Sequence, residues 1–265
     1  MKRIALILVV FVFPAIAMGQ MKKYEYTPKV KNKVEINNLL GEIALQNAPG
    51  NAIVIESDFK MDIPERAAGL KLLGAMEDNT EIGINVSEEN GIVSIQGVVK
   101  QVCDHKFKIL VPVGMSVNLN YNSPFANGNL LIDSFRGSLD IHTLSANVKI
   151  TNSAGPFTVN TISGDVEVVF NSISQDAPSS LVSVSGLVDV TVPSAEKATF
   201  GISTFNGNVF NNLDLKPKKE EEPDKRTLTY GLYALKHDTG EFTLNGGGQK
   251  VYLKSVSGNI YLRKR

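Results

Sequence analysis

The sequence predicts an all-β protein: a single-stranded, right-handed parallel β-helix (β-solenoid) with short coils of about 18–22 residues and one short helix. Three observations predict this fold: short segments of alternating apolar residues, a constant spacing of nine residues between segments, and a small residue opening each one. The segments are Gly-Asn-Leu-Leu-Ile (128–132), Gly-Ser-Leu-Asp-Ile (137–141), Ala-Asn-Val-Lys-Ile (146–150), Gly-Pro-Phe-Thr-Val (155–159) and Gly-Asp-Val-Glu-Val (164–168).

The alternation within each segment predicts a strand with one buried face. Successive side chains of a strand point to opposite faces, so the third and fifth residues of every segment point the same way. None of these ten residues is polar; they are Leu130, Ile132, Leu139, Ile141, Val148, Ile150, Phe157, Val159, Val166 and Val168. The small opening residue suits a turn. Each unit is therefore a strand followed by a corner, and two units make one coil.

Further segments of the same form extend the repeat over most of the chain, at 41–45, 51–55, 186–190, 207–209, 240–244, 249–253 and 258–262. An antiparallel sandwich also uses many short strands of even spacing. The constant phase, without the reversal that hairpins require, favours a solenoid. We therefore expect the opening residues to stack in chain order; they are Gly128, Ala146, Gly164, Gly186 and Gly207.

Stacking of coils predicts specific neighbours inside and outside. Two internal columns are expected, one of Leu130, Val148 and Val166 and one of Ile132, Ile150 and Val168. On the outer face Asn129, Asn147 and Asp165 should align, and Lys149 should lie over Glu167. These five outward residues form the candidate interaction surface.

Two segments depart from the repeat. Residues 64–76 begin with a first-turn proline followed by good helix formers, which predicts the one short helix. Residues 216–226 contain no apolar side chain other than proline, which predicts a flexible charged loop or, alternatively, a binding element.

The first 19 residues have the layout of a secretory signal peptide: Lys2-Arg3, an apolar run at 4–13, and small residues at 15–19. A membrane anchor would need about 20 apolar residues, and this run is half that length. Cleavage after Ala17 or Gly19 would leave a single β-solenoid domain, residues 20–265, without a stable transmembrane segment. We expect an exported protein of the periplasm, cell surface or extracellular space.

Composition excludes some classes of function. The 265 residues hold 27 Lys and Arg against 27 Asp and Glu, and this balance argues against a nucleic-acid binder. Cys103 is the only cysteine, so no intramolecular disulfide forms. The cluster Cys103-Asp104-His105 is too small for a zinc site, which needs three or four protein ligands. A buried or edge-strand thiol is favoured, and no metal, cofactor or catalytic residue is expected.

The chain resembles the bacterial putative-adhesin domains of unknown function that are common in Bacteroidetes. The resemblance rests on the Ser-Gly-Asp-Val-x-Val type of repeat, the signal peptide, Asp78-Asn79-Thr80 before alternating strands, and the strand at 108–112. It covers roughly residues 30–265. It implies an exported β-helix and transfers no catalytic motif.

We therefore expect a non-enzymatic adhesin or cell-envelope scaffold with an envelope or extracellular partner, either protein or glycan. A glycan-binding module is the alternative, followed by a polysaccharide-active β-helix enzyme. Asp165 and Glu167 share one face at a separation near that of glycosidase carboxylates. Outward carboxylates are ordinary on a solvated strand, however, and the chain has neither tryptophan nor long loops that would build a cleft.

Overall fold

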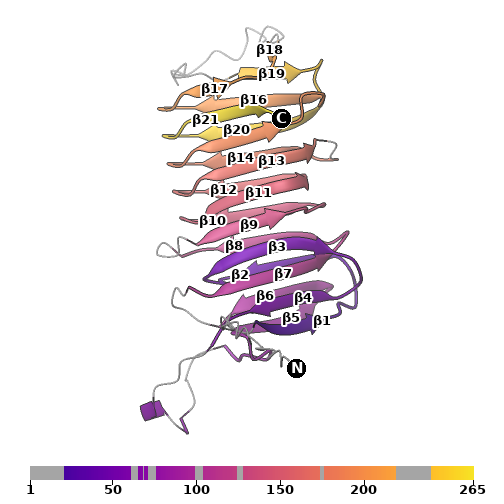
Figure 1. The fold of residues 1–265 in the computed structure, drawn as a ribbon, viewed down its shortest axis with the longest axis vertical. Coiled ribbons are helices and arrows are strands. Elements are labelled where there is room, and N and C mark those ends of the chain that lie inside the picture. The colour runs from indigo at the N-terminus through magenta and orange to yellow at the C-terminus, as the bar shows by residue number, and fades with distance from the viewer. Residues whose placement is uncertain are drawn as a thin grey trace, which may run out of the picture.

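The computed structural model describes residues 21–60, 65–67, 69–70, 76–98, 104–123, 128–173, 176–218 and 240–265. These residues form two large sheets that face one another along an elongated stack (Figure 1). The predicted signal peptide and Cys103 lie outside the described residues. Of the predicted helix, the described part contains one 3-10 turn, Glu65–Ala67.

Sheet A contains ten strands of the described chain. In spatial order they are β1 (Lys22–Tyr26), β4 (Ile53–Ser57), β7 (Lys106–Pro112), β3 (Glu42–Ala48), β9 (Asn129–Asp133), β11 (Asn147–Ala154), β13 (Val166–Ser172), β15 (Val188–Val192), β21 (Ile260–Lys264) and β17 (Val209–Asn211).

Sheet B contains eleven strands of the described chain. In spatial order they are β18 (Lys216–Pro217), β19 (Gly240–Leu244), β16 (Ala198–Thr204), β20 (Gln249–Ser255), β14 (Ser179–Ser183), β12 (Phe157–Thr161), β10 (Leu139–Thr143), β8 (Ser116–Tyr121), β2 (Lys33–Asn37), β6 (Ile92–Gly97) and β5 (Ile84–Glu89).

The middle of the stack has the predicted coil. From β8 to β15 the chain alternates between the sheets, and each strand from β8 to β13 pairs in parallel with the strand two places later. Val148 lies between Leu130 and Val166, and Ile150 lies between Ile132 and Val168, so both predicted columns are confirmed. These side chains are at most 2% exposed.

Antiparallel pairs at both ends correct the prediction of a wholly parallel helix. At one end β4 pairs antiparallel with β1 and β7, and β5 pairs with β6. The β5–β6 turn is Asn90-Gly91, with φ of 52° and 76°, a left-handed pair that suits a tight hairpin. At the other end β19 pairs antiparallel with β16 and β18.

The order of coils also differs from the prediction. The strands β20 and β21 lie between β14 and β15 on one side and β16 and β17 on the other, so the yellow end of the chain is inside the stack (Figure 1). Likewise β2 lies between β6 and β8, and β3 lies between β7 and β9. Gly258 therefore separates Gly186 from Gly207, which were expected to be neighbours.

The corners between sheets B and A have a buried hydroxyl ladder. In five coils a buried Ser or Thr accepts a hydrogen bond, at 2.8–3.1 Å, from the backbone N–H of the small residue three positions later. The hydroxyls belong to Thr143, Thr161, Ser183, Ser255 and Thr204. A Cβ at Gly186 would overlap the carbonyl oxygen of Gly164 in the neighbouring coil, which explains why glycine stands there.

The prediction of a charged loop over residues 216–226 is wrong for residues 216 and 217. Lys216–Pro217 form β18, which pairs with β19, and the N–H of Lys218 donates to the carbonyl oxygen of Glu241 at 2.8 Å. Backbone pairing does not depend on apolar side chains, so polar composition alone was a misleading signal here. Residues 219–226 lie outside the described residues.

Candidate functional site

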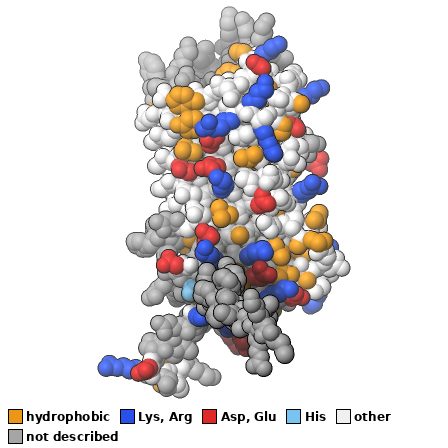
Figure 2. Space-filling model, viewed as in Figure 1, with side chains coloured by type: hydrophobic (Ala, Val, Ile, Leu, Met, Phe, Trp, Pro, Cys, Tyr) orange, Lys and Arg blue, Asp and Glu red, His pale blue; other side chains and the backbone are white. Residues whose placement is uncertain are grey.

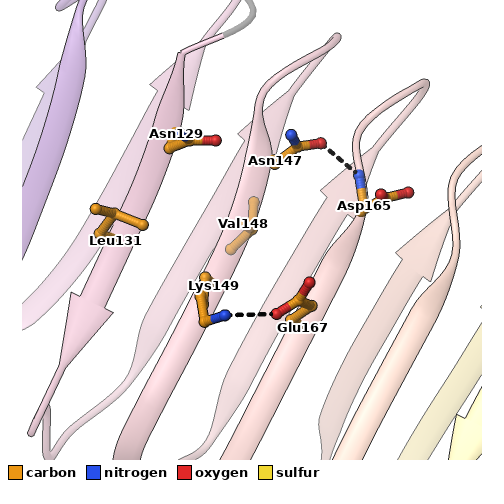
Figure 3. Close-up of a pocket in the computed structure, with 7 residues that line it drawn as sticks. All are labelled: Asn129, Leu131, Asn147, Val148, Lys149, Asp165 and Glu167. Carbon is orange, nitrogen blue, oxygen red and sulfur yellow. Dashed lines mark hydrogen bonds and ion pairs between the residues drawn. The ribbon is translucent and has the colours of Figure 1, made fainter.

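All five residues of the candidate interaction surface lie together on the outer face of sheet A. Asn129 is on β9, Asn147 and Lys149 are on β11, Asp165 directly precedes β13, and Glu167 is on β13. With Leu131 and Val148 they line a shallow depression of about 240 Å³ (Figure 3).

The asparagine and aspartate side chains of this surface bond to backbone. The side-chain Oδ1 of Asn147 accepts the N–H of Asp165 at 3.0 Å, and Oδ1 of Asp165 accepts the N–H of Leu187 at 3.0 Å. The same contact joins Oδ1 of Asn259 to the N–H of Asn208 at 2.9 Å. These side chains stabilise the starts of neighbouring strands, a role that the sequence interpretation missed.

The predicted contact of Lys149 with Glu167 is confirmed. Their Nζ and Oε2 atoms are 2.8 Å apart, and the side chains are 54% and 47% exposed (Figure 3). The Glu167 carboxylate raises the pKa of Lys149 by accepting its hydrogen bond and by charge attraction. Because the pair is solvated, its contribution to stability is at most about 1 kcal/mol.

The row that contains this ion pair continues toward the C-terminal end of the stack. The registers place Glu167 beside Asp189, Asp189 beside Tyr261, and Tyr261 beside Phe210. We call these four residues and Lys149 the outer row of sheet A. It crosses five strands, which lie about 4.8 Å apart.

The C-terminal part of the outer row is aromatic and was not predicted. The rings of Phe210 and Tyr261 stack with centroids 5.2 Å apart and an interplanar angle of 12°. Arg263 lies over the Tyr261 ring at 5.3 Å, and its Nε donates to both carboxylate oxygens of Asp189 at 2.8 and 2.9 Å. Phe210 is 50% exposed. The alternating pattern at 258–262 gave the strand, but the neighbour of Tyr261 depended on the order of coils.

Sheet B has a different depression, of about 290 Å³, around Ser180, Val182, Gly201 and Tyr252. The Tyr252 ring covers Gly201, where an added Cβ would lie 2.7 Å from the ring.

Charged side chains of both signs are interspersed over the face of the stack seen in Figure 2. Such mixing gives no extended field that would select a ligand of one charge.

Two histidines of the described residues each lie beside an aspartate. His142 Nε2 lies 3.0 Å from Asp140 Oδ1, and His105 Nδ1 lies 3.4 Å from Asp58 Oδ1. His105 also packs edge-on against Phe59, with ring centroids 4.9 Å apart. Within the described ranges, no three His, Cys, Asp or Glu side chains are grouped so that they could hold a metal ion.

The family is decided by the extent of one match. Residues 26–263 match the sequence pattern of the family Toastrack DUF4097. The chain belongs to this family. The predicted resemblance to a family of domains of unknown function is confirmed by this match.

One similar structure is a putative cell adhesion protein from Clostridium sporogenes, 10% identical, with a TM-score of 0.46; the match covers 93% of this chain and all of that chain. Another is a putative adhesin from Bacteroides fragilis, 11% identical, with a TM-score of 0.41 and coverage of 93% and 97%. A search of curated proteins finds no relative of this Toastrack chain. No helix in the described residues is both long and apolar enough to cross a membrane.

Proposed function

We propose that this Toastrack protein is exported and non-enzymatic, and that the outer row of sheet A binds a partner in the cell envelope or outside the cell, as an adhesin or scaffold does. The observation that carries the proposal is the row itself: charged and aromatic side chains held in register on five neighbouring strands. Because the strands already order the backbone, binding costs less conformational entropy than it would on a loop, which favours recognition.

The absence of enzymatic activity in this proposal is supported by the partners that the carboxylates of Asp165 and Glu167 already have. Asp165 accepts a backbone N–H, and Glu167 is paired with Lys149. The depression that they line is only partly enclosed. A glycosidase needs one carboxyl group free to give up a proton and a cleft that surrounds the sugar.

Export is supported by the arrangement of residues 1–19, with its basic start, apolar run and small residues. It places the protein in the periplasm, at the cell surface or outside the cell. For the middle coils we also propose the right-handed sense, because a crossover between parallel strands of one sheet is right-handed in nearly all proteins.

Glycan is the second candidate partner, favoured by the C-terminal part of the outer row. The exposed Phe210 ring offers an apolar face to the C–H groups of a sugar. Asp189 and Arg263, on the other side of Tyr261, offer an acceptor and donors for hydroxyl groups. An aromatic platform with few polar groups is a common ligand-binding arrangement.

The test combines a pull-down from envelope extracts with a glycan array, using the wild type and the double variant Phe210→Ala with Arg263→Ala. We expect the wild type to bind and the double variant to lose at least tenfold in affinity. The matched control is Asn160→Ala, on the outer face of sheet B. Binding that survives the double variant and is lost in the control would refute the assignment to sheet A. A discrete glycan hit would select the second candidate.

A further inference from the structure

The two sheets end in four edge strands, and those at the C-terminal end of the stack are short. The strand β17 has three residues, and β18 has two, of which Pro217 has no backbone N–H. Short edges and proline limit pairing with another chain. This end of the stack therefore offers little to a further strand.

At the opposite end, the edge of sheet B is closed by side chains. Asn79 Nδ2 donates to the carbonyl oxygen of Val86 at 2.8 Å, and Asn79 Oδ1 accepts the N–H of Val86 at 2.9 Å. Thr80 Oγ1 donates to the carbonyl oxygen of Ile84 at 2.9 Å. These contacts occupy backbone groups of β5 that a further strand would use.

In the part of the chain that the structure describes, no further strand follows β1 at the edge of sheet A. The strand β1 pairs with β4 over all five of its residues, and within the described parts of the chain its backbone bonds to no other strand. Every second N–H and C=O of an edge strand faces away from its partner. Among the described residues, the outward-facing donors and acceptors of β1 therefore have no backbone partner.

The sequence of β1, Lys-Lys-Tyr-Glu-Tyr, is complementary to itself in the antiparallel direction. With Tyr24 of one copy opposite Tyr24 of the other, Lys23 of each copy lies opposite Glu25 of the other. Both side chains are on the exposed face, 53% and 55% accessible, where they form an ion pair within one copy, and this pair would exchange partners across the new edge. Tyr24 and Tyr26 pack against the core. Lys23 already lies beside Glu56 in register, and Glu56 pairs with Lys108 at 3.4 Å, so the charges alternate across the sheet up to its edge.

We propose that two copies of this protein associate through β1, antiparallel and centred on Tyr24, so that the two A sheets form one continuous sheet. This inference does not rest on the proposed function. The paired surface is smaller than the standard interface of about 1,600 Å², so the dimer is weak and forms at high protein concentration. Its exposed ion pairs make it weaker at high salt.

The test is sedimentation of the purified protein over a concentration series, with charge-reversal variants of β1. The wild type should dimerise, and Lys23→Glu and Glu25→Lys should each be monomeric, because like charges then face each other. An equimolar mixture of the two variants should form a heterodimer, since opposite charges face again. The double variant Lys23→Glu with Glu25→Lys should restore the homodimer. The control is Lys149→Glu, an exposed charge on a central strand, which should dimerise like the wild type.

A wild type that stays monomeric at the highest concentration would overturn the proposal. So would a dimer that persists unchanged in both single variants, because it would use another surface. Loss in the single variants without recovery in the mixture and in the double variant would reject this register. Equal melting temperatures of all forms at low concentration would show that the variants keep the fold.

Discussion

The middle and the two ends of the stack are built from the same kind of segment but connected differently. In the middle, β9, β11, β13 and β15 are neighbours in chain order. Near the ends, β2 and β3 and also β20 and β21 are inserted between coils that are distant from them in the sequence. This difference shows that the repeat determines the shape of a coil, whereas other contacts determine which coils are neighbours.

Insertion protects the C-terminal segment of the described chain. An outermost coil would leave one edge of each strand unpaired, and chain termini are prone to fraying. In their inserted positions β20 pairs with β14 and β16, and β21 pairs with β15 and β17. The edges are formed by short or antiparallel strands instead.

Removal of residues 249–265 should have the largest effect, because it takes out an interior coil. Leu253, which lies between Leu181 and Ile202, would be lost together with Ile260, and coils on both sides would lose their partners. We expect no cooperative unfolding transition by circular dichroism. Removal of residues 21–26, the edge strand β1, is the control and should leave a folded protein with a lower urea midpoint. Equal outcomes would show that the inserted coil is not an essential layer.

The second-largest loss of stability is expected from a charge placed in the core at the middle of the stack. Val148→Asp places a carboxylate in a column that is 1% exposed and should cost several kcal/mol, of the order of 4 or more. Lys149→Asp, on the neighbouring exposed position, should change the free energy of unfolding by less than about 1 kcal/mol. Urea denaturation measures both; comparable losses would mean that the inward phase of β11 is misassigned.

A substitution in the hydroxyl ladder should lower the free energy of unfolding by less than a charge in the core does. Ser183 Oγ donates to the carbonyl oxygen of Gly164 at 2.9 Å and accepts the N–H of Gly186 at 2.9 Å, so Ser183→Ala leaves two buried groups unsatisfied. We expect a loss of about 1–3 kcal/mol in the free energy of unfolding. The exposed Ser185 of the same corner is the matched control, and Ser185→Ala should be nearly neutral. A neutral Ser183→Ala would argue that the ladder is dispensable.

The smallest effect concerns pH and Asp133 in the middle of the stack. Hydrogen bonds from Thr151 at 2.7 Å and from Ser134 at 2.9 Å lower the pKa of Asp133. A carboxyl group with a lowered folded-state pKa stabilises the fold above its unfolded pKa of about 4, and this stabilisation is lost as pH falls through the folded value.

Asp133→Asn should therefore be less stable than the wild type at pH 7, by at most about 1 kcal/mol. The gap should narrow below pH 4, as measured by urea midpoints across the pH series. A gap that stays constant down to pH 2 would contradict this role of the Asp133 carboxylate.

Several features could be predicted because they depend on local periodicity. The inward columns at Val148 and Ile150 and the ion pair of Lys149 with Glu167 follow from alternation and a fixed coil length. The hydroxyl ladder also has a local signal, Ser or Thr three residues before the small anchor, which was not used. Asn90-Gly91 between alternating segments likewise signalled the β5–β6 hairpin.

The sequence by itself determined the strands, their buried faces and the anchor residues, because these depend on side chains a few positions apart. The neighbours of each coil became clear only in three dimensions, since the segments at 186–190, 207–209 and 258–262 open with the same small-residue pattern, yet 258–262 pairs with both of the others. The aromatic stack of Phe210 on Tyr261 and the contact of Arg263 with Asp189 depend on that choice. Main-chain pairing is indifferent to residue identity, so the order of coils depends on packing over the whole stack, which no single segment encodes.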